Sequence, residues 1–118
     1  MGTHCFIVLE NPDKTVRYIF CHYDGYFANM IPILQKYYST RSSIEKLIEN
    51  GSIVSLQDSE QASDKHSMPV EELRNRWDFR HIWLENRTVN YYYIFTKEDE
   101  WYCESKYEMR FDDVIPKK

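Results

Sequence analysis

The sequence is poor in glycine, with only three in 118 residues. A loop that cradles phosphate groups needs several glycines, because its backbone N–H groups must approach the ligand closely. The Gly-x-Ser-x-Gly motif of serine hydrolases and the His-Glu-x-x-His motif of zinc peptidases are absent as well. These absences make the case for an enzyme weak, and we expect no catalytic residue, no metal and no cofactor.

Long apolar runs are also missing. No stretch of the sequence has the length of a membrane-spanning helix or the pattern of a signal peptide. The three cysteines, Cys5, Cys21 and Cys103, form no Cys-x-x-Cys pair, and an odd number cannot all be bridged within one chain. Free cysteines in apolar strands behave as small buried side chains. We therefore expect a protein of the reducing cytoplasm with no membrane partner.

Blocks of charge of one sign are the third absence, since 15 basic and 19 acidic residues are spread along the chain with a net charge of −4. Nucleic-acid binding depends largely on basic side chains, so a direct nucleic-acid binder is disfavoured. Aromatic residues, by contrast, are abundant at 16% of the chain, and ten of them are tyrosines. Tyrosine has an apolar ring and a polar tip, which suits either a strand core or a wet interface.

The length is that of one domain, residues 1–118, with a core that needs neither metal nor disulfide. Residues 3–9 and 15–23 are rich in aromatic and β-branched side chains. The Asn-Pro-Asp-Lys sequence at 11–14 has turn chemistry, so the two runs predict an antiparallel hairpin.

A second hairpin is predicted near the end of the chain, from residues 88–95 and 101–107 with a charged turn at 97–100. The first of these runs carries bulky side chains on both faces, which is typical of a central strand. The polar segment 57–68 has few apolar anchors and predicts a mobile surface loop.

Helical spacing of apolar residues predicts three helices. The first begins near Ile31, because Pro32 is best placed in a first turn. The second has a capping-box pair at Ser42 and Glu45, with Thr40 as a competing N-cap, and it ends before Gly51.

The third helix begins at Pro69 and carries Val70, Leu73 and Trp77 on one side, and residues 79–84 follow as a short strand. Together these elements predict an α+β fold, with an antiparallel sheet of about five strands and two or three helices packed on it.

Residues 18–56 carry most of a further pattern, which begins with Cys21-His22-Tyr23-Asp24-Gly25-Tyr26. Within this range it continues with Tyr37-Tyr38, residues 43–51 and Ser55-Leu56. Outside this range it includes the aromatic pairs of the last hairpin. This sequence resembles a family of small bacteriophage and prophage proteins that share a Cys-His-Trp-Asp-Gly-Tyr-like motif. It departs from them by a tyrosine in the tryptophan position and by the lack of proline and glycine after Gly25. The resemblance implies an accessory protein made in the host cytoplasm, where such proteins often disable a host enzyme or a defence system such as CRISPR–Cas.

The motif also contains the side chains most suited to chemistry. Cys21 and His22 are adjacent on a strand and point to opposite faces, so they form no thiolate–imidazolium pair. His22 and Asp24 can share a face, and His22 with His4 gives only two ligands of a metal site. Asp24 and Gly25 equally suit a strand end. The second functional hypothesis is therefore a small-ligand, nucleotide-like binder or minor enzyme that uses His22, Asp24 and Tyr26.

The first functional hypothesis is protein binding, because arginines and aromatic residues gather in the last third of the chain. The alternative is a solvated helix face on which the arginines pair with neighbouring glutamates. The proposed partner-binding residues are Trp77, Arg80, Trp83, Tyr91, Trp101 and Tyr102. The expected partner is a host or defence-system protein. The sequence allows no prediction of the oligomeric state.

Overall fold

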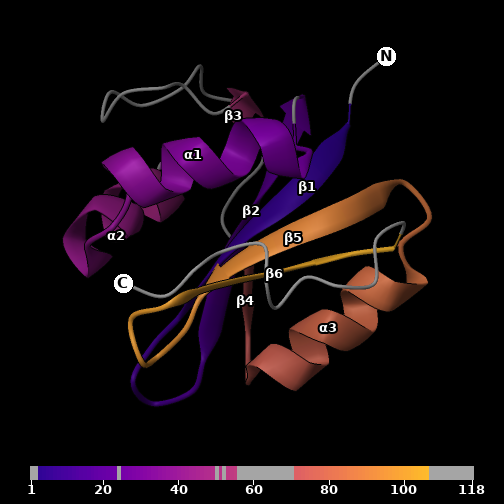
Figure 1. Ribbon diagram of the computed structural model, residues 1–118. Helices are drawn as coiled ribbons and strands as arrows, with labels where there is room; N and C mark the ends of the chain where they lie inside the picture. Colours follow the sequence, from indigo (N-terminus) through magenta and orange to yellow (C-terminus); the bar gives the residue numbers. More distant parts are fainter. Residues whose placement is uncertain (1–2, 24, 50, 52, 56–70, 107–118) are drawn as a thin grey trace.

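The computed structural model describes residues 3–23, 25–49, 51, 53–55 and 71–106 (Figure 1). Asp24 and the segment predicted as a mobile loop, 57–68, lie outside these residues. The described elements are β1 (His4–Glu10), β2 (Val16–Tyr23), α1 (Phe27–Tyr37), α2 (Arg41–Glu49), β3 (Ile53–Ser55), β4 (Glu71–Leu73), α3 (Arg76–Glu85), β5 (Val89–Phe95) and β6 (Trp101–Ser105). No helix among them is long and apolar enough to cross a membrane.

The strands form one sheet in the order β3-β2-β1-β5-β6, and β4 pairs with β2 beside β3. Both predicted hairpins are confirmed, because β1–β2 and β5–β6 are antiparallel. The α+β class is confirmed too, but the expectation of a purely antiparallel sheet is wrong. Strands β1 and β5 pair in parallel, as do β2 and β3, and the sheet is therefore mixed.

The central strands β1 and β5 are buried along nearly their whole length. Burial on both faces explains their continuous apolar sequences, which is the pattern that parallel pairing favours. An irregularity in the β1–β5 register falls after His4, where Val89 and Tyr91 face successive residues of β1. Because of this irregularity Val89 packs on the opposite face of the sheet from Tyr91, against the simple alternation of side chains.

Helices cover the sheet on both faces: α1 and α2 lie on one side and α3 on the other (Figure 1). The α1–α2 face buries mainly aliphatic and thiol side chains, including Ile7, Leu9, Met30, Leu34, Ile44, Ile48 and the three cysteines. The α3 face is mainly aromatic, with Phe6, Phe79, Trp83 and Tyr92 at its centre.

Helix α1 begins at Phe27, four residues before the predicted start, and Pro32 lies inside it. A proline at this position lacks the N–H that would bond to the carbonyl of Ala28. Both residues are exposed, so water can reach that carbonyl. The helix is retained because its other side buries Met30, Ile31, Ile33 and Leu34.

Helix α2 lies close to its predicted position, but its cap is the competing Thr40 and not the Ser42–Glu45 pair, because Ser42 already lies inside the helix. The Thr40 hydroxyl accepts the Ser43 N–H at 3.3 Å. Gly51 has a positive φ of 80°, as expected for the residue that follows a helix C-terminus.

The helix expected from Pro69 is wrong at residues 71–73, although Trp77 does lie in a helix, and the strand expected at 79–84 is wrong. Pro69 and Val70 lie outside the described residues. Residues 71–73 form β4, and the predicted strand at 79–84 is part of α3. Asn75 starts this helix by accepting the Asp78 N–H at 2.9 Å. Phe79 and Trp83, four residues apart, are its buried residues.

Candidate functional site

The structure divides the six residues that the sequence proposes for partner binding. Trp83 is only 1% exposed and Tyr91 8%, and they belong to the cores on opposite faces of the sheet. Trp101 packs on the α1–α2 face, where its ring lies 5.3 Å from that of Phe95. These three residues therefore contribute little or nothing to a surface shared with the others.

Trp77, Arg80 and Tyr102 do come together, on the α3 side of the molecule. Arg76 of α3 links two of them: its guanidinium carbon lies 5.3 Å from the Trp77 ring centre and 5.4 Å from that of Tyr102. Such distances allow cation–π attraction to both rings. We refer to Arg76, Trp77, Arg80 and Tyr102 as the α3 surface.

Arg80 is held in place by β6. Its guanidinium donates two hydrogen bonds to the Glu104 carboxylate, at 2.9 and 2.6 Å, and the Tyr92 hydroxyl donates to the same carboxylate at 2.7 Å. Arg76 and Arg80 are four residues apart on α3, and they contact Tyr102 and Glu104, two residues apart on β6. This spacing aligns the helix with the edge strand and fixes the two arginine side chains.

The charges of this group are mutually stabilised. Burial by itself raises the pKa of the Glu104 carboxyl. The hydrogen bonds from Arg80 and Tyr92 together lower this pKa by a larger amount, so the net shift is downward. Burial and the bond to Glu104 raise the pKa of the Tyr92 hydroxyl, which keeps its proton. The group is suited to holding structure and not to moving protons near neutral pH.

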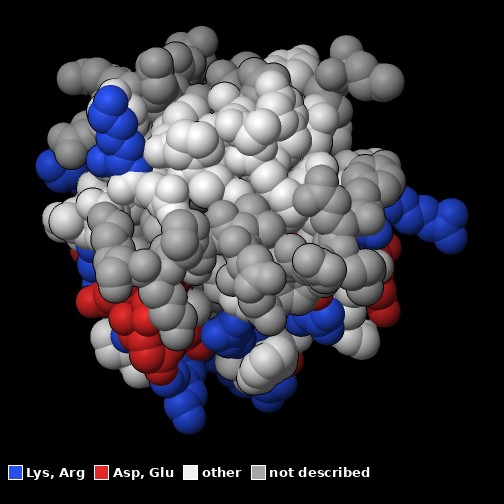
Figure 2. All heavy atoms as spheres, in the orientation of Figure 1, with Lys and Arg blue, Asp and Glu red and all other residues white. Residues whose placement is uncertain are grey.

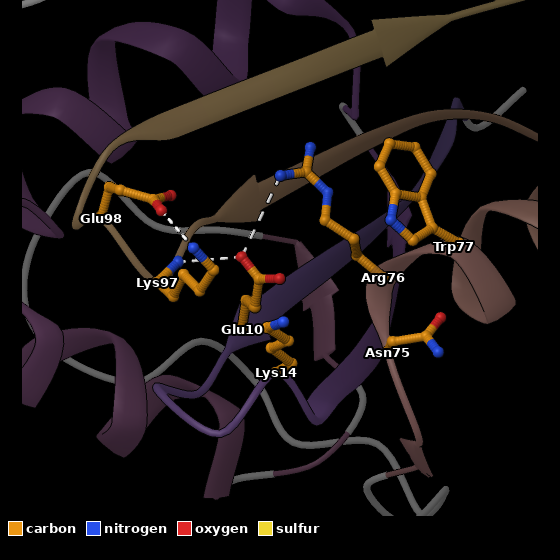
Figure 3. Close-up of a pocket in the computed structure, with 7 residues that line it drawn as sticks. All are labelled: Glu10, Lys14, Asn75, Arg76, Trp77, Lys97 and Glu98. Carbon is orange, nitrogen blue, oxygen red and sulfur yellow. Dashed lines mark hydrogen bonds and ion pairs between the residues drawn. The ribbon is translucent and has the colours of Figure 1, made fainter.

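A pocket of about 500 Å³ opens beside the α3 surface (Figure 3). Three segments line it: the β1–β2 connection, the start of α3 and the β5–β6 turn. The lining residues are Glu10, Lys14, Asn75, Arg76, Trp77, Lys97 and Glu98. Sequence reasoning found only Trp77 among them as a site residue, because the other segments are far apart along the chain.

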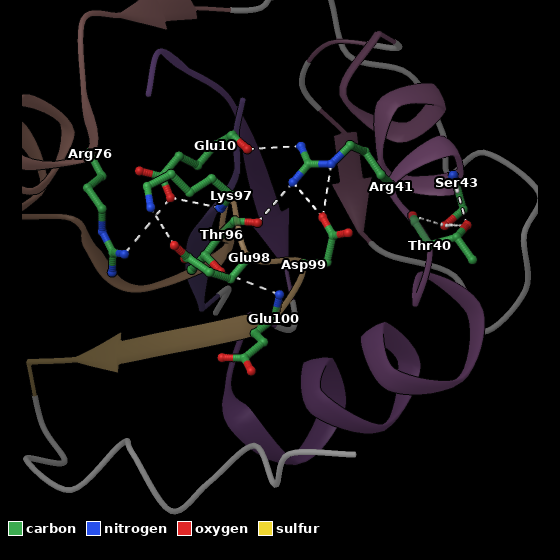
Figure 4. Close-up of polar contacts among 10 residues, drawn as sticks. All are labelled: Glu10, Thr40, Arg41, Ser43, Arg76, Thr96, Lys97, Glu98, Asp99 and Glu100. Carbon is green, nitrogen blue, oxygen red and sulfur yellow. Dashed lines mark hydrogen bonds and ion pairs between the residues drawn. The ribbon is translucent and has the colours of Figure 1, made fainter. Parts of the chain in front are cut away.

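The walls of this pocket are fixed by a polar network around Glu10 (Figure 4). The Glu10 carboxylate is buried and accepts the Lys97 N–H at 2.9 Å, and its nearest Arg76 nitrogen is 4.0 Å away. Arg41 donates to the Glu10 and Thr96 carbonyls, each at 2.9 Å. It also forms an ion pair with Asp99 at 2.8 Å. These bonds hold the β5–β6 turn against the end of β1.

The residues of the ligand-binding hypothesis are not gathered. His22 lies on the α3 face of β2, where its ring is 4.7 Å from that of Phe20. Tyr26 caps α1, which covers the other face, and Asp24 is outside the described residues. His4 approaches His22, and its Nδ1 lies 2.6 Å from the His22 carbonyl oxygen.

Gly25 in the same motif is needed for space. It is not among the described glycines with positive φ, but a Cβ there would lie 2.7 Å from the Cys5 Cβ and 2.9 Å from the Thr3 carbonyl oxygen. The Gly25 carbonyl also accepts the buried Tyr93 hydroxyl at 2.5 Å. Glycine is therefore required at position 25 by close packing and not by a left-handed backbone conformation.

The cysteines offer no reactive thiol in this arrangement. All three are buried, and none of them forms a disulfide. Burial raises the pKa of the Cys5 thiol well above its usual range, and its hydrogen bond with Cys21 adds to the effect. A protonated thiol is a poor nucleophile. Within the described part of the chain, no three His, Cys, Asp or Glu side chains are grouped closely enough to hold a metal ion.

Comparisons with protein-family models, with curated proteins and with solved structures found no match to this chain. The α3 surface and the pocket beside it are therefore the features of the molecule that bear on its function.

Proposed function

We propose that this chain is a phage-encoded accessory protein that acts in the host cytoplasm by binding another protein through the α3 surface. The partner is a host or defence-system protein, with CRISPR–Cas components as the first class to test. The phage origin is proposed from the resemblance of the Cys21–Tyr26 motif, and the binding mode from the geometry of α3.

The exposure of Trp77 carries the proposal. Trp77 is 66% exposed, the largest fraction among the exposed large apolar residues that the structure describes, and Ile82 and Leu84 of the same helix are 39% and 48% exposed. Exposed tryptophan beside fixed arginine is the composition of interface hot spots. Tyr102 extends this surface onto β6, where Glu104 holds Arg80.

Mixed charge around α3 suits a protein partner better than a nucleic acid. On the face shown in Figure 2, the lower half carries both acidic and basic side chains, with the acidic ones gathered mainly at the lower left, and the region over α1 carries few charges. The phosphate backbone of a nucleic acid would be repelled by the acidic side chains there. It would also be repelled by the net charge of the protein, which is −4. A protein partner can match both signs with its own side chains.

Capture of partners from host lysate tests the proposal when it is done with matched variants. The wild-type chain, Trp77→Ala and Tyr23→Ala are compared as tagged baits at equal loading, and captured proteins are identified by mass spectrometry. Tyr23 is the control, because it is an exposed aromatic residue (47%) at the end of strand β2 and not on α3.

We expect one stoichiometric partner with the wild type and with Tyr23→Ala, and its loss with Trp77→Ala. A partner retained by Trp77→Ala but lost by Tyr23→Ala would move the interface away from α3 and contradict the proposal. A blank with all three baits, repeated at low salt and with purified defence complexes, would also contradict it.

A further inference from the structure

The pocket beside the α3 surface contains more basic than acidic groups, and its acidic groups are already engaged. Glu10 is 3% exposed and bonded to the Lys97 N–H. Glu98 pairs with the Lys97 ammonium group. A ligand that enters the pocket therefore meets little free negative charge.

Lys14 provides the free positive charge. Its side chain is exposed, and its ammonium group has no ion-pair partner among the described residues; Figure 3 shows no dashed line to it. The backbone at Lys14 is fixed by a turn, in which its N–H donates to the Asn11 carbonyl at 2.9 Å with φ at 78°. The base of this flexible side chain therefore has a set position at the edge of the pocket.

The start of α3 adds positive potential to the same place. The aligned peptide dipoles of a helix give its N-terminus a partial positive charge. Arg76 stands in the first turn, and its guanidinium is oriented by the Trp77 and Tyr102 rings. Beside these charges the exposed Trp77 indole offers an apolar wall.

We propose that this pocket receives a short acidic segment of the partner protein, with an Asp or Glu carboxylate at Lys14 and an adjacent apolar side chain against Trp77. The inference rests on the proposed function and names the chemistry of the partner. A carboxylate matches the unpaired ammonium, and the indole needs an apolar neighbour that a free anion does not have.

Selection of peptides by the full chain provides the test. A display library of random peptides is selected against the tagged wild-type protein, and the most enriched peptide is labelled and titrated by fluorescence anisotropy. The titrations include Lys14→Glu, Trp77→Ala and, as a matched charge-reversal control, Lys46→Glu on the exposed side of α2.

We expect enriched peptides to carry Asp or Glu next to an apolar residue. Lys14→Glu and Trp77→Ala should each weaken the binding about tenfold or more, whereas Lys46→Glu should leave it unchanged. Replacing the peptide carboxylate by lysine should abolish binding to the wild type and restore it to Lys14→Glu.

The inference would be overturned if the enriched peptides were not acidic, if Lys46→Glu weakened binding as much as Lys14→Glu, or if binding did not depend on Lys14. If lysate capture still depends on Trp77 in that case, the proposed function survives and only the acidic recognition fails. Binding of inorganic phosphate or of single-stranded DNA with the same dependence on Lys14, but of no acidic peptide, would assign the pocket to free anions or nucleic acid and also overturn it.

Discussion

The two faces of the sheet solve the same packing problem with different side chains. The α1–α2 face is covered by two helices and filled with aliphatic and thiol groups. The α3 face has one short helix and is filled by aromatic rings in tilted and edge-to-face contacts, for example Phe79 with Tyr18 at 5.0 Å and Trp83 with Tyr92 at 4.7 Å. A single helix covers less of a sheet, so large rings and the Arg80–Glu104 pair complete the covering.

This difference places the candidate interface on the more sparsely covered face. The helix that buries Phe79 and Trp83 also exposes Trp77, Ile82 and Leu84. Among the residues that the structure describes, three of the five exposed large apolar ones therefore belong to one element of ten residues. The comparison shows that α3 buries aromatic rings on one side and leaves apolar side chains exposed on the other, and the proposed recognition surface uses these exposed side chains.

The largest expected effect comes from removing a ring at the centre of the aromatic face. Phe79→Ala should lower the free energy of unfolding by about 3–5 kcal/mol, because Phe79 is fully buried and contacts the rings of Phe6, Tyr18 and Tyr92. Ile82→Ala on the same helix should cost less than about 1 kcal/mol, since Ile82 is already exposed. Urea unfolding of both variants measures the contrast, and equal losses would refute the assignment of the two sides of α3.

An intermediate effect, sensitive to pH, is expected from the charged pair on the same face. Glu104→Gln should cost about 1.5–3 kcal/mol near neutral pH, because it weakens charge-assisted bonds to Arg80 and Tyr92. The pKa of Glu104 is lower in the folded chain than in the unfolded chain. Its contribution is therefore complete above the unfolded-state pKa and is lost as pH falls through the folded-state value.

The measurement is the unfolding free energy of wild type and Glu104→Gln from neutral to acidic pH. The gap between them should narrow as the acid range is entered, whereas Glu49→Gln, an exposed control, should show a small gap throughout. A gap for Glu104→Gln that stays constant into the acid range would show that the carboxylate is not stabilised as described.

The smallest of the three effects tests close packing on the aliphatic face. Gly25→Ala should cost about 1–3 kcal/mol, because the new Cβ meets the Cys5 Cβ and a backbone carbonyl, neither of which can move freely. Gly51 requires a backbone conformation instead, so asparagine there should be tolerated better than alanine. At Gly25 the order should reverse, with asparagine worse than alanine, and thermal unfolding of the four variants would expose the opposite ranking.

Local signals in the sequence were sufficient for the hairpins and for α2. Turn residues at 11–14 and 97–100 join adjacent strands, and Thr40 and Gly51 mark helix ends directly. Parallel pairing of β1 with β5 has no such local signal, because it is decided by contacts between distant segments. The start of α3 was misplaced because apolar spacing at 70–77 suggested a helix where 71–73 pairs with β2.

The candidate site could be predicted only in part. The sequence located the aromatic and arginine residues of the last third, but residue type does not report which face a ring occupies. Trp77 and Trp83 differ by six positions on one helix, and the first is 66% exposed while the second is 1% exposed. The sequence could not place Lys14 beside Trp77, because the pocket is formed by three segments that come together only in the folded chain.

The parallel pairing of β1 and β5 has a consequence for synthesis of the chain. About 80 residues separate the end of β1 from the start of β5. At about 5–20 residues per second, β1 has one bare edge for roughly 4–16 s before its partner emerges. During that time the unpaired edge of β1 can pair with a strand of another chain. Expression at a high level should therefore favour aggregates, which pairing with β5 would otherwise prevent.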